Sequence, residues 1–134
     1  MKIDGRCHCG FISYEAEIDP EQAMICHCTD CQTLSGSAFR TMVDTREDGF
    51  KLLSGGLKIY VKVGDNGAKR QQAFCPECGS PIYSTSDGDG PKVYSIRLGT
   101  SRQRVELVPK TQIWCRSALS WVGELTRGRR IETQ

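Results

Sequence analysis

The 134-residue sequence has no long apolar run, since its longest apolar stretches are only a few residues. A membrane-spanning helix needs about 18 or more such residues in succession. The N-terminus, MKIDGRCHCG, also has no apolar core of the length that a secretory signal peptide requires. These absences predict a soluble protein of the cytoplasm, where thiols stay reduced.

The sequence also has little excess charge and few aromatic residues. It carries 18 basic and 16 acidic side chains, and Phe, Trp and Tyr make up 7% of the chain. A nucleic-acid-binding protein typically has a basic stripe with stacking aromatics, and a protein that binds a membrane surface is typically strongly basic. We therefore expect neither a nucleic acid nor a membrane as the main partner, and the oligomeric state stays open.

Segments with a helical pattern are scarce, and most of the chain has the pattern of β-strands. In FISYEAEI (11–18), apolar residues alternate with Ser and Glu, which is the period of a half-buried strand. LKIYVKV (57–63) repeats this pattern, and Ser54-Gly55-Gly56 before it predicts a hairpin with FKLL (50–53). Further strands are predicted at 69–74, 81–86, 92–99, 106–108 and 111–115, several of them beside Gly-rich turns such as 65–67 and 87–90.

Only SALSWVGEL (117–125) could hold about two helical turns. No linker or repeat divides the chain, so we expect one mainly β domain over residues 1–126 and a flexible tail over 127–134. Short strands with many turns bury little core, so such a domain gains from a bound metal whose binding free energy becomes folding free energy.

Cysteine is abundant instead, with eight residues in tight clusters. An even count could indicate four disulfides in a secreted protein, but no secretory signal is visible. Spacings of two and three residues suit several thiolates that converge on one ion. The clusters are CxC (Cys7, Cys9), CxCxxC (Cys26, Cys28, Cys31) and CxxC (Cys75, Cys78), with Cys115 alone.

Two of the clusters predict a closed, four-cysteine zinc site. In an extended strand, Cys7 and Cys9 would present both sulfurs to one side, with His8 facing away. In CPECG (75–79), two thiolates three residues apart across a tight turn form a knuckle, and Gly79 lets the backbone curl. Two such pairs give a tetrahedral site with four sulfur ligands, the usual structural zinc site.

The remaining cluster, CHCTDC (26–31), offers three thiolates and no obvious fourth ligand. Three protein ligands and an open position are typical of catalytic zinc. Such zinc is a modest Lewis acid, but it holds an incoming thiol as a thiolate at neutral pH. The open position therefore suits a sulfur substrate, and we expect this zinc to be held less tightly than the closed one.

Other arrangements remain open at this point. CxCxxC could close with Cys115, His8 or His27 to give a second structural site, and CxxC could pair with part of CxCxxC. His27 lies between two ligands and should face away from the metal, in the core or beside the site. Cys115 is interpreted as a small buried apolar residue of a strand.

The ordered motifs resemble those of the glutathione-dependent formaldehyde-activating enzyme family, to which centromere protein V also belongs. They are GRCHCG (5–10), CHCTDCQTLSGSAF (26–39), FCPECGSPIY (74–83) and the late Trp121. The resemblance covers nearly the whole chain. It implies the family's mainly β fold of small coiled sheets, the Mss4-like type, stabilised by zinc.

The resemblance also implies two zinc ions per chain and a role for each cysteine motif. The structural zinc ligands of the family fall on Cys7, Cys9, Cys75 and Cys78, and the catalytic zinc ligands fall on Cys26, Cys28 and Cys31. The family activity is the joining of glutathione to formaldehyde, which gives S-hydroxymethylglutathione and is classed as a carbon–sulfur lyase activity. Ser35-Gly36-Ser37 and Phe39 match the loop after the catalytic cysteines.

Some positions depart from the family pattern. LGTSRQRVEL (98–107) has Ser-Arg-Gln where many members have an acidic stretch, and Gln112 stands where a histidine is frequent. Ala118-Leu119-Ser120 stands in place of Lys-Ala-Pro. Neither change touches a predicted metal ligand, so the departures concern the substrate.

These patterns lead to one hypothesis and two rivals. A substrate thiolate at the open zinc position would attack a small aldehyde held beside it, so the expected partners are a small-molecule thiol and aldehyde. The rivals are a binding module with two structural zincs and a thiol redox enzyme that uses Cys115. The candidate general acids are His27, Asp30, Ser35 and Ser37, and the candidate ligands of the glutathione carboxylates are Arg40, Arg70, Arg97 and Arg102.

Overall fold

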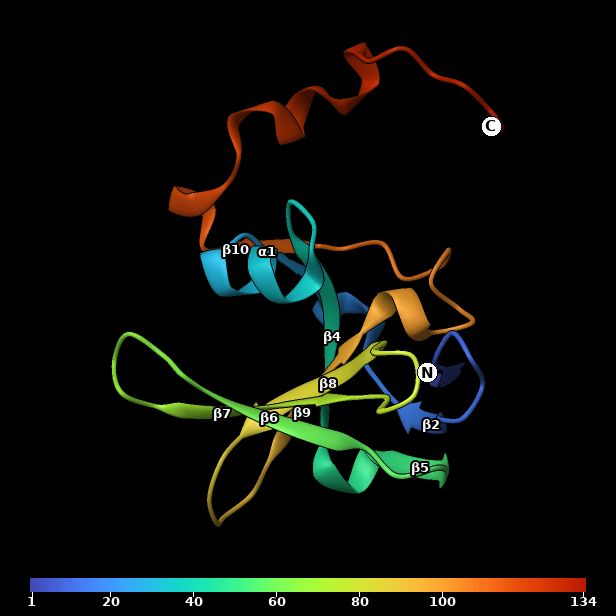
Figure 1. Ribbon diagram of the computed structural model, residues 1–134, viewed down its shortest axis with the longest axis vertical. Coiled ribbons are helices and arrows are strands. Elements are labelled where there is room, and N and C mark those ends of the chain that lie inside the picture. The colour runs from blue at the N-terminus through green and yellow to red at the C-terminus, as the bar shows by residue number, and fades with distance from the viewer.

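The computed structural model describes residues 1–134 and confirms a mainly β protein built on two sheets (Figure 1). The smaller sheet has the strand order β1-β2-β5, with β1 at Lys2–Arg6, β2 at Ser13–Glu17 and β5 at Phe50–Ser54. The larger sheet has the order β10-β3-β4-β9-β8-β7-β6. Its strands are β3 (Ala23–Cys26), β4 (Arg40–Arg46), β6 (Lys58–Val63), β7 (Lys69–Phe74), β8 (Pro81–Ser86), β9 (Val93–Arg97) and β10 (Thr111–Ile113).

Helices are short and mark the ends of strands. The only α-helix is α1 (Thr29–Ser35), which follows β3 and lies beside β10 in Figure 1. The 3₁₀ helices are η1 (Pro20–Gln22), η2 (Glu47–Gly49), η3 (Leu98–Thr100), η4 (Cys115–Ser117) and η5 (Ser120–Arg127). None of these helices has the length and apolar character that crossing a bilayer would require.

One buried core joins the two sheets. Ile3 and Tyr14 come from the small sheet, and Val43, Ile82 and Ile96 come from the large one, each at most 1% exposed. Burial of a side chain of this size contributes about 1.5–3 kcal/mol to folding. The alternation that predicted a strand in 11–18 is thus confirmed, because the apolar face of β2 enters this core.

The predicted hairpin between 50–53 and 57–63 is wrong. Strand β5 pairs with β2 in the small sheet, whereas β6 pairs with β7 in the large sheet. Gly55 between them has φ of +80° and packs against the carbonyl of Phe11. The chain therefore turns away from β5 before β6 begins. Strand β6 lies at the edge of the large sheet, and its apolar side chains are partly exposed, Ile59 to 40% and Val61 to 41%.

Three other local predictions also need correction. Residues 106–108 form no strand, and the strand expected at 111–115 is limited to β10, which pairs in parallel with β3. The helix expected at 117–125 is the 3₁₀ helix η5, interrupted at Glu124. The chain after β10 departs from the sheets in Figure 1, and much of its apolar surface, such as Trp121, is exposed.

Candidate metal centres

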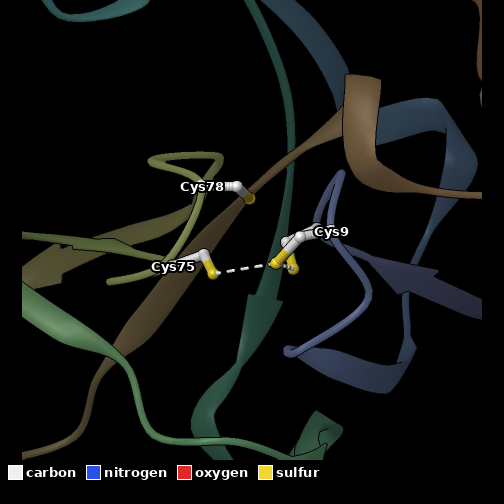
Figure 2. Close-up of side chains that lie close together, drawn as sticks. Cys9, Cys75 and Cys78 are labelled. Atoms are coloured by element: carbon white, nitrogen blue, oxygen red, sulfur yellow. Dashed lines mark hydrogen bonds between the residues drawn. The ribbon is translucent and has the colours of Figure 1, made fainter.

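Four cysteine sulfurs converge where the β1–β2 turn meets the β7–β8 turn. The sulfur of Cys9 lies 3.6 Å from that of Cys7 and 3.8 Å from that of Cys75. Figure 2 shows Cys9, Cys75 and Cys78 approaching one another from the two turns. All four sulfurs lie within 4.8 Å of one another. A tetrahedral zinc with sulfur ligands at ~2.3 Å needs sulfur separations of about 3.8 Å, so these four residues fit that ion.

The two turns are shaped by glycines and by hydrogen bonds to sulfur. Cys7 and Cys9 do not lie in an extended strand, as the sequence analysis expected, because β1 ends at Arg6 and Gly10 turns the chain with φ of +85°. The Ile12 N–H donates to the Cys7 sulfur at 3.2 Å. On the other side, a hydrogen bond from Ser80 lowers the pKa of the Cys78 thiol to about 5.

A second cluster of three sulfurs lies where β3 passes into α1. Cys26 ends β3, Cys28 is the N-cap of α1, and Cys31 lies in its first turn. The Cys31 N–H donates to the Cys28 sulfur at 3.2 Å, so one ligand also caps the helix that carries another. The three sulfurs lie within 4.8 Å of one another, and no His, Asp or Glu joins them. Three thiolates in this arrangement fit a zinc ion with one position left open.

The thiols of this cluster differ in acidity. The hydrogen bond from Cys26, a second one from Cys28, and the charges of Arg40 and Arg97 together lower the pKa of Cys31 to about 5. The hydrogen bond to Cys31 and burial raise the pKa of Cys26. The lowered pKa favours the thiolate form of Cys31, which is the form that binds a metal.

The remaining candidates for a fourth ligand lie elsewhere. His27 is 1% exposed and its Nε2 lies 2.7 Å from Gln112 Oε1, while its ring packs edge-on against Phe39. Cys115 is exposed and begins η4, so its interpretation as a buried strand residue is wrong. His8 is exposed in the β1–β2 turn and joins neither cluster. All eight cysteines are free, with no disulfide.

A pocket of about 430 Å³ lies between α1 and the β6–β7 hairpin. Leu34, one turn after Cys31, lines it together with Arg40 and Arg97. Both arginines are only 6% exposed, and both donate to Gln72 Oε1, at 3.3 and 3.0 Å. Burial, and then the charge of Arg40, lower the pKa of Arg97 to about 9, so its guanidinium stays charged at neutral pH.

The other two candidate arginines occupy different positions. Arg70 donates to Ser84 Oγ at 3.4 Å and lies near enough to Arg97 to affect its pKa. Arg102 is exposed, forms an ion pair with Asp4 at 2.8 Å, and lines a separate hollow beside the four-cysteine cluster. Gln72, which joins the two buried arginines, was missed in the sequence analysis because nothing in KRQQAF distinguishes it from Gln71.

The candidate general acids are also placed by the structure. Asp30 forms an ion pair with Lys62 at 2.8 Å, and Ser35 Oγ donates to the Gln32 carbonyl at 3.4 Å. Gln32, which the sequence analysis did not single out, donates to the carbonyls of His27 and Ser117 and so joins α1 to the segment after β10.

The sequence profile of the glutathione-dependent formaldehyde-activating enzyme family matches residues 2–117. The chain belongs to this family. No curated protein sequence matches the chain. Among solved structures, the fold is similar to that of a protein from Rhodobacter sphaeroides, with 20% sequence identity and a TM-score of 0.63. That similarity covers 81% of this chain and 98% of the other.

The family match spans both cysteine clusters and ends within η4. It therefore leaves out η5 and the last residues, where the exposed Trp121 lies. One departure from the family pattern has a structural role here, because Gln112 supplies the hydrogen-bond partner of the buried His27 ring.

Proposed function

We propose that the protein joins a thiol similar to glutathione to a small aldehyde similar to formaldehyde, as a carbon–sulfur lyase. The observation that carries this proposal is the contrast between the two clusters. Four sulfurs surround one centre, whereas only three surround the other and leave a position open. Arg40 and Arg97, which lie near Cys31, line a pocket on that side of the molecule. The family to which the chain belongs supports the same reaction class.

The two clusters have different proposed roles. Cys7, Cys9, Cys75 and Cys78 would hold a structural zinc ion, because they complete its coordination and leave no open position. Cys26, Cys28 and Cys31 would hold a catalytic zinc ion. Zinc bound there supplies an open position at which a substrate thiol loses its proton and becomes nucleophilic.

The residues around the three-cysteine cluster would orient the two reactants. The pocket between α1 and β7 is large enough for a small molecule, and Leu34, which lines it, lies one turn after Cys31 on α1. Leu34 and Phe74 would form an apolar wall on one side of the reactants. The buried charges of Arg40 and Arg97 favour a thiolate over a thiol in this region.

The reaction itself needs no other cofactor. A bond forms between the sulfur and the carbonyl carbon, the carbonyl π bond becomes an O–H bond, and the proton that the thiol lost to solvent is replaced on the oxygen. The gain in rate would come from holding the two reactants together. Asp30 and Ser35 already have partners in the structure, so neither is proposed as the proton donor.

The rate of adduct formation from glutathione and formaldehyde, with zinc-saturated protein and above the uncatalysed background, tests the proposal. We expect clear acceleration, and we expect Cys31→Ser to abolish it and to reduce bound zinc from two ions to one. Cys115→Ser is the matched control, because Cys115 is exposed and outside both clusters. Full activity in Cys31→Ser would refute the catalytic role, and loss of activity in Cys115→Ser would favour thiol redox chemistry.

A further inference from the structure

Three polar residues meet on one face of the large sheet, beside the three-cysteine cluster. Arg40 lies on β4, Arg97 on β9 and Gln72 on β7. The strand register places Arg40 opposite Cys26 and Arg97 opposite Met42, which packs against Cys26 and Cys31. The cluster and the two arginines therefore belong to the same face.

The two guanidiniums are buried without a carboxylate partner. None of the ion pairs in the structure involves Arg40, Arg70 or Arg97. Arg97 Nη1 has only the sulfur of Met42, at 3.6 Å, and Arg97 Nε has no hydrogen-bond partner. Buried arginines are normally paired because an uncompensated buried charge is costly. Two such residues side by side indicate that a negative group belongs between them.

The cysteine cluster compensates only part of this charge. The cluster lies beside the arginines on this face, because Arg40 is the strand partner of Cys26 and Met42 packs against both Cys26 and Cys31. A zinc ion with three thiolates carries about one net negative charge by formal count, which is less than the charge of two guanidiniums. One negative group is still needed to balance the site while the open position of the zinc holds no thiolate.

We propose that Arg40, Arg97 and Gln72 form a binding site for a carboxylate of the substrate. The planar guanidinium presents paired N–H donors that match the two oxygens of a carboxylate. Leu34, Phe74 and Pro81 line the same pocket and suit the alkyl part of such a molecule. The assignment to a substrate rests on the proposed function, whereas the binding of a carboxylate does not.

The decisive variant is Gln72→Glu. It places a carboxylate, in nearly the same volume, at the oxygen that already accepts from both arginines. We expect this internal carboxylate to raise the melting temperature and to abolish external carboxylate binding. Gln71→Glu is the matched control for carboxylate binding, because it adds the same charge to the next residue of β7. Its new carboxylate would face Asp87 and not the arginines, so its melting temperature should not rise.

Binding is measured first, without turnover, by calorimetric titration of the zinc-loaded protein with propionate. We expect wild type and Gln71→Glu to bind propionate, and Gln72→Glu to bind it at least tenfold more weakly, as the loss of a charged hydrogen-bonded contact predicts. Equal binding by all three proteins would place the anion at the metal and overturn the proposal. The absence of binding to wild type would overturn it as well.

Kinetics then identify which reactant carries the carboxylate. In the first comparison the aldehyde is always formaldehyde, and the thiol is either 3-mercaptopropionate or 2-mercaptoethanol. In the second comparison the thiol is always 2-mercaptoethanol, and the aldehyde is either glyoxylate or formaldehyde. We expect one acidic reactant to have at least a tenfold lower KM than its neutral counterpart in wild type, and the preference to vanish in Gln72→Glu. A preference in neither pair would overturn the substrate assignment. If propionate binds as expected but the protein accelerates adduct formation for no combination of thiol and aldehyde, the proposed reaction is refuted while the carboxylate site stands.

Discussion

Lys62 Nζ lies 2.8 Å from Asp30 Oδ2, so an ion pair joins the edge strand β6 to the helix that carries Cys31. The pair joins the two elements whose residues Leu34 and Ile59 line the pocket that Arg40 and Arg97 also line. This contact joins two residues that are 32 positions apart in the chain, and it holds α1 against β6.

Breaking this ion pair is expected to affect the site more than the stability. Asp30 is about half exposed, and surface pairs contribute about 0–1 kcal/mol. Lys62→Met should therefore change the free energy of unfolding by less than about 1 kcal/mol and raise KM for the thiol, because α1 is no longer held against β6. Denaturant titration and steady-state kinetics measure the two effects. Lys69→Met, on the neighbouring strand β7, in no ion pair and outside the pocket, serves as the control, and an equal KM effect there would contradict the prediction.

Metal removal is expected to occur in two steps. A chelator should first take the ion from the three-cysteine cluster, since an open site binds less tightly, with loss of activity and little change in melting temperature. Further chelation should empty the four-cysteine cluster, in which Cys7 and Cys75 are part of the core, and lower the melting temperature strongly. Zinc content, activity and thermal unfolding are followed on the same samples. Simultaneous loss of activity and fold would contradict this order.

A methyl group at Gly5 is expected to destabilise the protein. A Cβ there would collide with the Tyr14 hydroxyl and with the Thr100 carbonyl. Overpacking of this kind costs about 1–3 kcal/mol, so Gly5→Ala should lower the free energy of unfolding by that amount. Gly99→Ala is the control, because a Cβ at Gly99 meets no atom within 4 Å, and it should change stability by less than about 0.5 kcal/mol.

Tyr14 makes the stability depend on alkaline pH. Burial raises the pKa of its hydroxyl to about 12, although the hydrogen bond with Thr100 acts in the opposite direction. The folded protein holds this hydroxyl in its neutral form more strongly than the unfolded chain does. The resulting contribution to the free energy of unfolding is complete below the pKa of about 10 that the group has in the unfolded chain, and it is lost as the pH rises toward 12. Tyr14→Phe lacks the titrating group.

The variant should therefore be about 1 kcal/mol less stable than wild type near pH 8, because the hydrogen bond to Thr100 is lost. This difference should shrink or reverse near pH 11. Denaturant titrations at the two pH values measure it, and a difference that grows with pH would contradict the assignment.

Local patterns in the sequence predicted local structure well. The strand at 81–86 coincides with β8, and the turn at 65–67 joins β6 and β7. Alternation and turn residues depend only on near neighbours, so they can be recognised in one sequence. The convergence of sulfurs within each cysteine motif was also predictable, because two- and three-residue spacings bring them together. The pairing of CxC with CxxC was left open by the spacings and was implied by the family resemblance.

Contacts between distant segments were not predictable. Strand β5 pairs with β2, although its apolar pattern suited a hairpin with β6 just as well. The helix α1 is only seven residues long and is capped by a cysteine rather than a usual capping residue, so it gave no clear signal. Arg40 and Arg97 were named among four candidate arginines, but only the register of β4, β9 and β7 shows that they converge on Gln72.

The four-cysteine cluster has a consequence for folding. Cys9 and Cys75 are 66 residues apart in the chain, so an ion held there closes a loop that spans half of the protein. A disulfide across a loop of that length lowers the conformational entropy of the unfolded chain, which stabilises the folded state by about 4 kcal/mol, and a link through the ion would act in the same way. The fraction of the protein that is folded is then expected to follow the zinc supply of the cell.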